Sequence, residues 1–206
     1  ISKKNKPVII STGTASYNDI LKAIKIFKKK GNKNLAVLHC VSSYPANYNE
    51  MNINFIKTLQ SKFKIPIGFS DHTLDHFSAT IATSLGASII EKHITLSRKL
   101  FGPDHFFSLN PNQLGLFTKK IFDTKEILGK SRKIVSETEK LISLKARRSI
   151  FSKKSIKAGE KLNLNNLKIV RPGNGLKPEH LKQIINKKIK IDIPSDYPIS
   201  IKLLKK

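Results

Sequence analysis

The chain has 206 residues, of which 39% are hydrophobic and 26% are charged, a balance typical of a globular protein with a substantial core. No apolar run approaches the roughly 18 residues that span a bilayer, and the single cysteine, Cys40, excludes a disulfide framework. No apolar segment follows the first residues to form a secretory signal, so we expect a cytoplasmic protein without a membrane partner.

The formal net charge of +25 favours binding to nucleic acid, because Lys and Arg that neutralise phosphates release counterions. Only five of the 39 basic residues are arginines, which recognise phosphates and bases through paired hydrogen bonds. The lysines occur in short scattered groups without interleaved aromatic residues. We therefore interpret the charge as a solvated basic surface and expect no specific nucleic-acid partner. A basic nucleic-acid-binding protein stays as the alternative from a different functional class.

Residues 7–128 alternate between short segments rich in β-branched residues and amphipathic segments with helical spacing. This alternation predicts a parallel sheet in which a helix follows each strand. The expected strands are residues 7–11, 34–40, 65–70 and 88–93, and the expected helices are residues 17–30, 51–63, 74–85 and 111–128. The residues expected to introduce these helices are Ser16, Asn49, Thr73 and Asn110.

Four strand–helix units are half of a (β/α)8 barrel, or TIM barrel, which needs about 250 residues. The sequence therefore predicts an α/β fold in which residues 1–128 form the C-terminal half of such a barrel. Because the chain begins at Ile1 without an initiator Met, we also expect an N-terminal truncation.

The composition changes after the predicted half-barrel. Residues 129–146 break the alternation and are expected to form a linker with some helical character. Residues 147–206 predict a small β-rich module, of a size that is marginal on its own. Its expected strands are residues 148–151, 156–160, 167–170, 188–192 and 199–203, with a turn at residues 172–175.

Two histidines end successive strands of the predicted sheet. Catalytic groups of a parallel barrel lie at the carboxyl ends of its strands, so His72 and His93 are expected to converge on one divalent ion. Water or substrate oxygens would complete the shell of ligands; the alternative is that both are hydrogen-bonded structural residues. His72 and His76 have the spacing of a zinc-binding helix but lack its Glu, and we interpret that spacing as coincidence.

Three further features of the sequence each allow two interpretations. The turn Ser11-Thr12-Gly13 either starts a helix or cradles a phosphate with hydroxyls and amides. Cys40 is interpreted as a small core residue rather than a nucleophile. The segment Gly102-Pro103-Asp104-His105 belongs to a loop between residues 95 and 110 that is long enough to bind substrate, with a plain turn as the alternative.

Together these segments resemble the sialic acid (N-acetylneuraminate) synthase family, which includes the pseudaminic and legionaminic acid synthases. The resemblance covers essentially the entire chain, and the motifs are specific in combination rather than singly. They are Leu-His-Cys-Val-Ser-Ser-Tyr-Pro at residues 38–45, Gly-Phe-Ser-Asp-His-Thr at 68–73, Glu-Lys-His-Ile-Thr at 91–95, Gly-Pro-Asp-His at 102–105 and Arg-Pro-Gly-Asn-Gly at 171–175.

The resemblance implies a condensation of phosphoenolpyruvate with an N-acylated aminosugar of the mannosamine type. The products are a nine-carbon 2-keto acid and phosphate. In the family a divalent metal, typically Mn²⁺, is held by the histidines that match His72 and His93, where it activates the sugar aldehyde. A related phosphoenolpyruvate-dependent keto-sugar synthase is the nearest alternative, although the appended β module argues against it.

The resemblance also assigns substrate contacts. Ser11 and Ser70 match residues along phosphoenolpyruvate, and Ser42 matches a nearby position that is Asn in some sialic acid synthases. Tyr44 and Asp104 match residues that contact the aminosugar, with Asp104 among the expected catalytic residues.

The module at residues 147–206 resembles the family's SAF, or antifreeze-like, domain. In the family this domain is swapped across a homodimer, so that the Arg matching Arg171 contacts the N-acyl group of the sugar in the partner subunit. The first half of the family's barrel supplies a catalytic Glu and a Lys that binds phosphoenolpyruvate. We therefore expect this polypeptide alone to be inactive.

Overall fold

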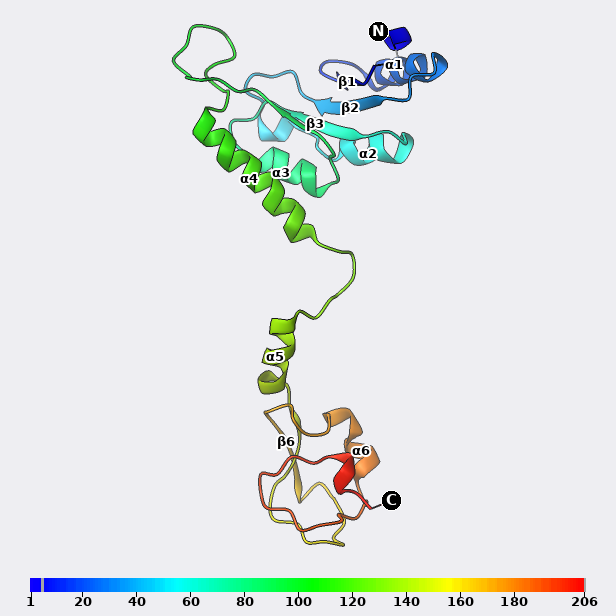
Figure 1. Ribbon diagram of the computed structural model, residues 1–206, viewed down its shortest axis with the longest axis vertical. Coiled ribbons are helices and arrows are strands. Elements are labelled where there is room, and N and C mark those ends of the chain that lie inside the picture. The colour runs from blue at the N-terminus through cyan, green and yellow to red at the C-terminus, as the bar shows by residue number, and fades with distance from the viewer. Residues whose placement is uncertain (5, 206) are drawn as a thin grey trace. The chain divides into compact units, whose positions relative to one another are not determined.

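The computed structural model describes residues 1–4 and 6–205. The chain divides into two units, with a boundary between Lys130 and Ser131. The first unit holds a parallel sheet with strand order β1–β2–β3–β4 (Figure 1). The predicted α/β half-barrel is confirmed. Its strands are β1 (Val8–Ser11), β2 (Leu35–Cys40), β3 (Ile67–Asp71) and β4 (Ile90–Lys92), and the helices that follow them are α1 (Tyr17–Lys29), α2 (Phe55–Lys62), α3 (Phe77–Ser84) and α4 (Pro111–Leu128).

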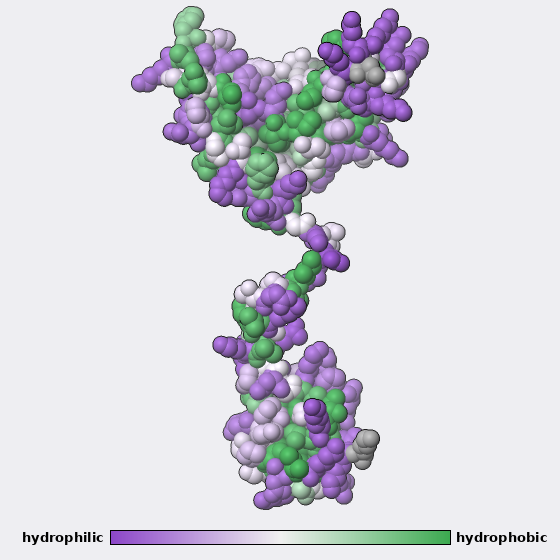
Figure 2. Space-filling model, viewed as in Figure 1, coloured by the Kyte–Doolittle hydropathy of each residue, from purple (hydrophilic) through white to green (hydrophobic). Residues whose placement is uncertain are grey.

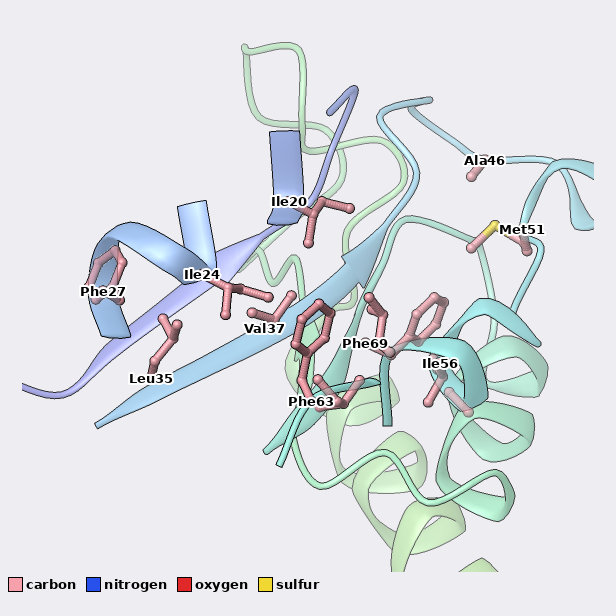
Figure 3. Close-up of a cluster of buried hydrophobic side chains, with 13 residues drawn as sticks. Ile20, Ile24, Phe27, Leu35, Val37, Ala46, Met51, Ile56, Phe63 and Phe69 are labelled. Atoms are coloured by element: carbon pink, nitrogen blue, oxygen red, sulfur yellow. The ribbon is translucent and has the colours of Figure 1, made fainter. Parts of the chain in front are cut away.

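One face of the sheet is covered by helices. Alternate residues of β2 and β3, among them Val37 and Phe69, point into an apolar core shared with α1, α2 and α3 (Figure 3). His39 also belongs to this layer, where it is buried and its Nε2 donates to the Met51 carbonyl oxygen at 2.6 Å. The buried members of the core are Ile20, Ile24, Phe27, Leu35, Val37, Ala46, Met51, Ile56, Leu59, Phe63, Ile67, Phe69 and Ala82.

Two of the four expected helix starts are confirmed. Ser16 and Asn110 each form a capping box, in which the side chain of the cap and that of the third helical residue satisfy backbone amides reciprocally. The start expected at Asn49 is wrong, because Asn49 lies in a short 3-10 helix (Tyr48–Glu50) and Asn52 then adopts a left-handed φ of 45°. The start expected at Thr73 is also wrong.

The chain after β3 shows why Thr73 does not cap a helix. Its amide and its hydroxyl both donate to the carboxylate of Asp71, at 2.9 and 2.8 Å. The Thr73 hydroxyl thus donates to Asp71 instead of accepting from a helix amide. Helix α3 begins at Phe77, whose amide donates to Asp75 at 2.8 Å. A local turn between Asp71 and Thr73 at the strand end therefore precedes a helix that begins three residues later than Leu74, the expected first residue.

The second unit is a small module with its own apolar core, built around residues such as Ile150, Ile156 and Ile189. It begins with α5 (Glu137–Ala146), a helix within the expected linker, and contains the antiparallel pair β5 (Ser149–Ser152) and β6 (Leu167–Val170) and the short helix α6 (Leu181–Ile184). The segment 156–160 forms one isolated bridge and the segment 188–192 forms two, in place of the expected strands. A 3-10 helix (Ile201–Leu203) occupies most of the expected last strand. These three expectations are wrong, because isolated bridges and a helical turn already bury Ile156, Ile189 and Leu203.

Within the described ranges, no helix combines the length and the apolar character that crossing a membrane requires.

The half-barrel leaves apolar surface open at its strand edges. Within residues 1–4 and 6–205, β1 and β4 each pair with one neighbouring strand, apart from a single bridge between Ile94 and Leu109 beside β4. Ile9 of β1 is 55% exposed, and green hydrophobic surface is visible on this unit in Figure 2. Unpaired strand edges recruit other strands, so we expect the chain to self-associate.

Static light scattering checks this expectation. The purified chain should show an average mass above the monomer value of 23.2 kDa that rises with protein concentration. The variant Ile9→Lys places a charge on the open edge and should lower that mass, whereas Ile26→Lys, at a comparably exposed position on α1, should not. A monodisperse monomer at all concentrations would refute the expectation.

Candidate active site

The carboxyl ends of the strands carry the predicted site residues on the face opposite to the helices. Successive residues of a strand point to opposite faces. Phe69 and Ile90 pack in the core below the helices, so Ser70 and Glu91, the next residues along, face the open side. His72 and His93 follow two residues later at the ends of β3 and β4.

The structure brings His72 and His93 together as the sequence predicts. Their ring centroids are 5.1 Å apart, and the planes are inclined at 70°. The ring of Tyr44 lies 4.3 Å from that of His72 and 5.9 Å from that of His93, while Phe107 packs 4.9 Å from His93. Asp104 joins them from the long loop, with its Oδ2 3.8 Å from His93 Nδ1. Four residues from separate segments therefore surround one point, closed on one side by a buried phenylalanine.

The hydrogen bonding of His72 leaves one nitrogen available. Its Nδ1 lies 2.7 Å from the carbonyl oxygen of Val41, a group that can only accept, so Nδ1 carries the proton and Nε2 presents a lone pair. Burial lowers the pKa of His72, but hydrogen bonds to Cys40 and Val41 and the Asp71 carboxylate outweigh burial and raise the pKa above its ordinary value. Histidines that bind a metal through one ring nitrogen usually donate the N–H of the other ring nitrogen to a group such as a backbone carbonyl.

The two imidazoles fit a shared divalent ion. With metal–nitrogen bonds of about 2.1 Å, rings that hold one ion at a right angle or wider lie roughly 4.5–6 Å apart, which includes the observed separation. Within the described part of the chain, no group of three or more His, Cys, Asp or Glu side chains is placed to hold a metal. The two histidines therefore fit an open metal site with two protein ligands, in which the other coordination positions are free for water or substrate oxygens.

Two predicted serines meet at a carboxylate that the sequence analysis did not single out. Ser70 Oγ donates to Glu91 Oε1 at 2.7 Å, and Ser11 Oγ lies 3.4 Å from the same oxygen. Glu91 is thus the third member of a cluster that spans β1, β3 and β4. Its position two residues before His93 on the same strand was the available signal, because it places both side chains on one face.

The turn after β1 corresponds only in part to the expected phosphate cradle. Thr12 Oγ1 accepts from the Cys40 amide at 2.9 Å and so ties β1 to β2. At the start of α1 the Asp19 carboxylate accepts from the Ser16 amide at 3.2 Å, so a negative charge already occupies the helix N-terminus. Gly13 has a left-handed φ of 49°, and a Cβ there would lie 3.1 Å from Ser42 Oγ. The turn therefore contributes Ser11 and places Ser42 beside it, but a capping box already engages the amides of Ser16 and Asp19.

Cys40 is buried at the end of β2, with its Sγ 3.9 Å from His72 Nδ1. Burial raises the pKa of its thiol, but hydrogen bonds to His72 and Ser70 outweigh burial, so the pKa lies below its ordinary value. Cys40 thus contacts His72 on the Nδ1 side of its ring.

The loop that carries Asp104 is anchored beside His93. The Leu109 amide donates to the His93 carbonyl oxygen at 3.0 Å, and the Thr95 amide donates to the Leu109 carbonyl oxygen at 2.8 Å. Inside the loop, Thr95 Oγ1 and His105 Nδ1 are 2.8 Å apart. These bonds return the loop to the strand end and so hold Asp104 near the histidines.

In the second unit, Arg171 follows β6 and is exposed. The turn after it is fixed by Ser149, whose Oγ donates to the Pro172 carbonyl oxygen at 2.6 Å and accepts from the Gly175 amide at 3.0 Å. Arg148, which the sequence analysis did not select, lines the same shallow depression of about 360 Å³ as Arg171. In the described residues neither guanidinium forms an ion pair, so both are available to a ligand.

A parallel half-barrel with histidines, serines and a glutamate at its carboxyl edge places the first unit among the α/β folds of the TIM-barrel type, in which active sites lie at that edge. The sequence matches the NeuB family over residues 1–133 and the SAF domain over residues 147–205. The chain belongs to the NeuB family, and the resemblance to the sialic acid synthases is confirmed.

Named relatives agree with this assignment. The chain is 41% identical to "Uncharacterized protein MJ1065" of Methanocaldococcus jannaschii, over 95% of this chain and 58% of the relative. It is 34% identical to the N,N'-diacetyllegionaminic acid synthase of Legionella pneumophila, over 93% of this chain and 55% of that enzyme. The crystal structure of an N-acetylneuraminic acid (sialic acid) synthetase from Leptospira borgpetersenii in complex with citrate superposes with a TM-score of 0.63 and 39% identity, over 68% of this chain and 49% of that one. The chain spans a little over half the length of these curated relatives.

Proposed function

We propose that this chain forms part of a synthase that condenses phosphoenolpyruvate with an N-acylated aminosugar of the mannosamine type. The new carbon–carbon bond joins the enol carbon to the carbonyl carbon of the open-chain sugar aldehyde, whose oxygen takes up a proton. A water molecule adds to the carbon that bears the phosphate, phosphate leaves, and a nine-carbon 2-keto acid is released. The observation that carries the proposal is the pair His72 and His93, 5.1 Å apart at the carboxyl edge of the sheet, with Nε2 of His72 free.

In this proposal His72 and His93 would hold a divalent metal, Mn²⁺ in the first instance, which would supply Lewis-acid polarisation of the aldehyde carbonyl. Tyr44 and Asp104 border the same point and bind the aminosugar, which the contacts with both histidine rings support. Ser11, Ser42 and Ser70 bind phosphoenolpyruvate. Glu91 orients the hydroxyls of Ser11 and Ser70, as its hydrogen bonds suggest.

The second unit completes the proposal. Arg171 binds the N-acyl group of the aminosugar in the partner subunit of a domain-swapped homodimer, and Arg148 adds a second positive charge to the same depression. Support comes from the fixed turn that presents Arg171 and from its free guanidinium. We place the reaction in the cytoplasm, where phosphoenolpyruvate is formed.

A chimera tests the function directly. The 206 residues replace the matching segment of the Legionella pneumophila N,N'-diacetyllegionaminic acid synthase, so that a complete barrel can form around this site. We expect phosphate release from phosphoenolpyruvate that depends on Mn²⁺ and on an N-acylated aminosugar. The 206-residue chain alone should release none, because four strands do not enclose a barrel active site.

Two controls sharpen the assay. The chimera with His93→Ala should lose at least about 1,000-fold in kcat, in line with the several kcal/mol that a Lewis acid supplies. The chimera with His180→Ala, which changes a histidine of the second unit whose ring contacts Gln183 and Glu179, should keep its activity. A folded chimera that releases phosphate without any aminosugar, or not at all, would contradict the proposal.

A further inference from the structure

A buried ion pair lies directly behind the two histidines. Asp71 ends β3 and Lys92 ends β4, and the two are register partners in the sheet. Lys92 Nζ is 3.0 Å from Asp71 Oδ2, and the side chains are only 4% and 0% exposed. Lys92 Nζ also lies 5.8 Å from the ring centroid of Phe117 in α4, so the pair is on the helix side of the sheet.

The pair holds the backbone on both sides of His72. Oδ1 of Asp71 accepts from the amide and the hydroxyl of Thr73, while Lys92 Nζ donates to the Thr73 carbonyl oxygen. Residues 71 and 73 are therefore both tied to Lys92, the residue that immediately precedes His93. One network thus links the chain positions that orient the two imidazoles.

A buried charge pair is a costly way to join two strands. Burial lowers the pKa of Lys92, although the Asp71 carboxylate opposes that effect. Apolar side chains of similar size often stabilise a fold as well as a buried ion pair does, or better. Stability alone therefore does not account for this arrangement, whereas its bonds to Thr73 fix a particular geometry of the strand ends.

We propose that Asp71 and Lys92 are positioning residues that hold His72 and His93 at the separation and orientation needed to bind one divalent ion. The inference rests on the proposed function, in which these histidines hold the metal. It differs from that function in assigning the geometry of the site to a pair of charges that contact neither metal nor substrate.

Mn²⁺ titrations followed by electron paramagnetic resonance test the inference on the whole 206-residue chain. We expect Asp71→Asn and Lys92→Met each to weaken Mn²⁺ binding 10- to 100-fold, the loss typical of residues that orient metal ligands. The double variant should weaken binding by about the same factor as either single variant, because the two residues act as one pair. The matched control is the exposed pair Lys119 and Asp123 of α4, whose changes Lys119→Met and Asp123→Asn should leave the affinity unchanged.

An apolar replacement separates positioning from stability. The double variant Asp71→Leu/Lys92→Met should recover the thermal unfolding temperature of the parent chain, or exceed it, yet keep the weakened Mn²⁺ binding. If this variant folds as stably as the parent and binds Mn²⁺ equally well, the inference is overturned.

A second readout does not depend on the metal. In ¹⁵N–¹H spectra at pH 8, the parent chain should show His72 as a single tautomer protonated at Nδ1, because that proton bonds Val41. Asp71→Asn and Lys92→Met should both show mixed tautomers, and an unchanged single tautomer in folded variants would count against positioning. A parent chain that shows this tautomer but does not bind Mn²⁺ would instead defeat the proposed metal site.

Discussion

Replacing His72 by alanine is expected to weaken Mn²⁺ binding by more than about 100-fold, because the site has two protein ligands and loss of a ligand exceeds the effect of losing a residue behind one. His93→Ala should have the same effect. The measurement is a titration of the purified chain with Mn²⁺, with the free ion followed by electron paramagnetic resonance. Circular dichroism of each variant verifies that the half-barrel is retained.

His76 offers a matched control within the same segment. It lies four residues from His72 in sequence, but its ring stacks on Phe77 at 5.0 Å and is not part of the histidine pair. His76→Ala should therefore bind Mn²⁺ as the parent chain does. If His76→Ala abolishes binding and His93→Ala does not, the metal is held by the i, i+4 pair and the site proposed at the strand ends is wrong.

Gly68→Ala is expected to destabilise the first unit by about 3 kcal/mol or more, at the upper end of the range for overpacked cores. Gly68 is the second residue of β3, and a Cβ there would be 2.4 Å from the Ile89 carbonyl oxygen and 2.5 Å from Leu38 Cδ2. One obstacle is backbone, so a side-chain rotation cannot relieve the clash. The strands that carry His72 and His93 would have to separate.

Gly115 provides the comparison for this substitution. It is exposed on α4, and a Cβ there would meet nothing within 4 Å. Gly115→Ala should stabilise the protein by about 1 kcal/mol, the difference in helix propensity between the two residues. Urea unfolding followed by circular dichroism measures both variants, and a Gly68→Ala protein as stable as the parent would show that β3 and β4 pack less closely than described.

The fold of the first unit could be predicted because local patterns and tertiary packing agree there. The alternation of strand and helix segments predicted the order of the elements, and the ends of the expected strands indicated His72 and His93. The prediction of helix starts failed where a candidate cap formed a different local hydrogen bond, as when the hydroxyl of Thr73 donates to Asp71 two residues before it. The left-handed conformation of Asn52 likewise has no clear signal in a single sequence.

The site was predicted less completely than the fold. The family resemblance assigned Ser11 and Ser70 to substrate binding, but it did not show that both hydroxyls face Glu91. Arg148 was missed for a similar reason, because its proximity to Arg171 depends on the pairing of β5 with β6. Pairwise arrangements of this kind depend on register, which the sequence pattern does not specify for such short strands.

Anomalous diffraction at the manganese absorption edge, from crystals of the chimeric synthase grown with Mn²⁺, tests the central claim most directly. The account predicts one strong anomalous peak about 2.1–2.3 Å from a ring nitrogen of both His72 and His93, a usual metal–nitrogen distance. A peak at other residues, or occupied manganese sites with none at this pair, would contradict it.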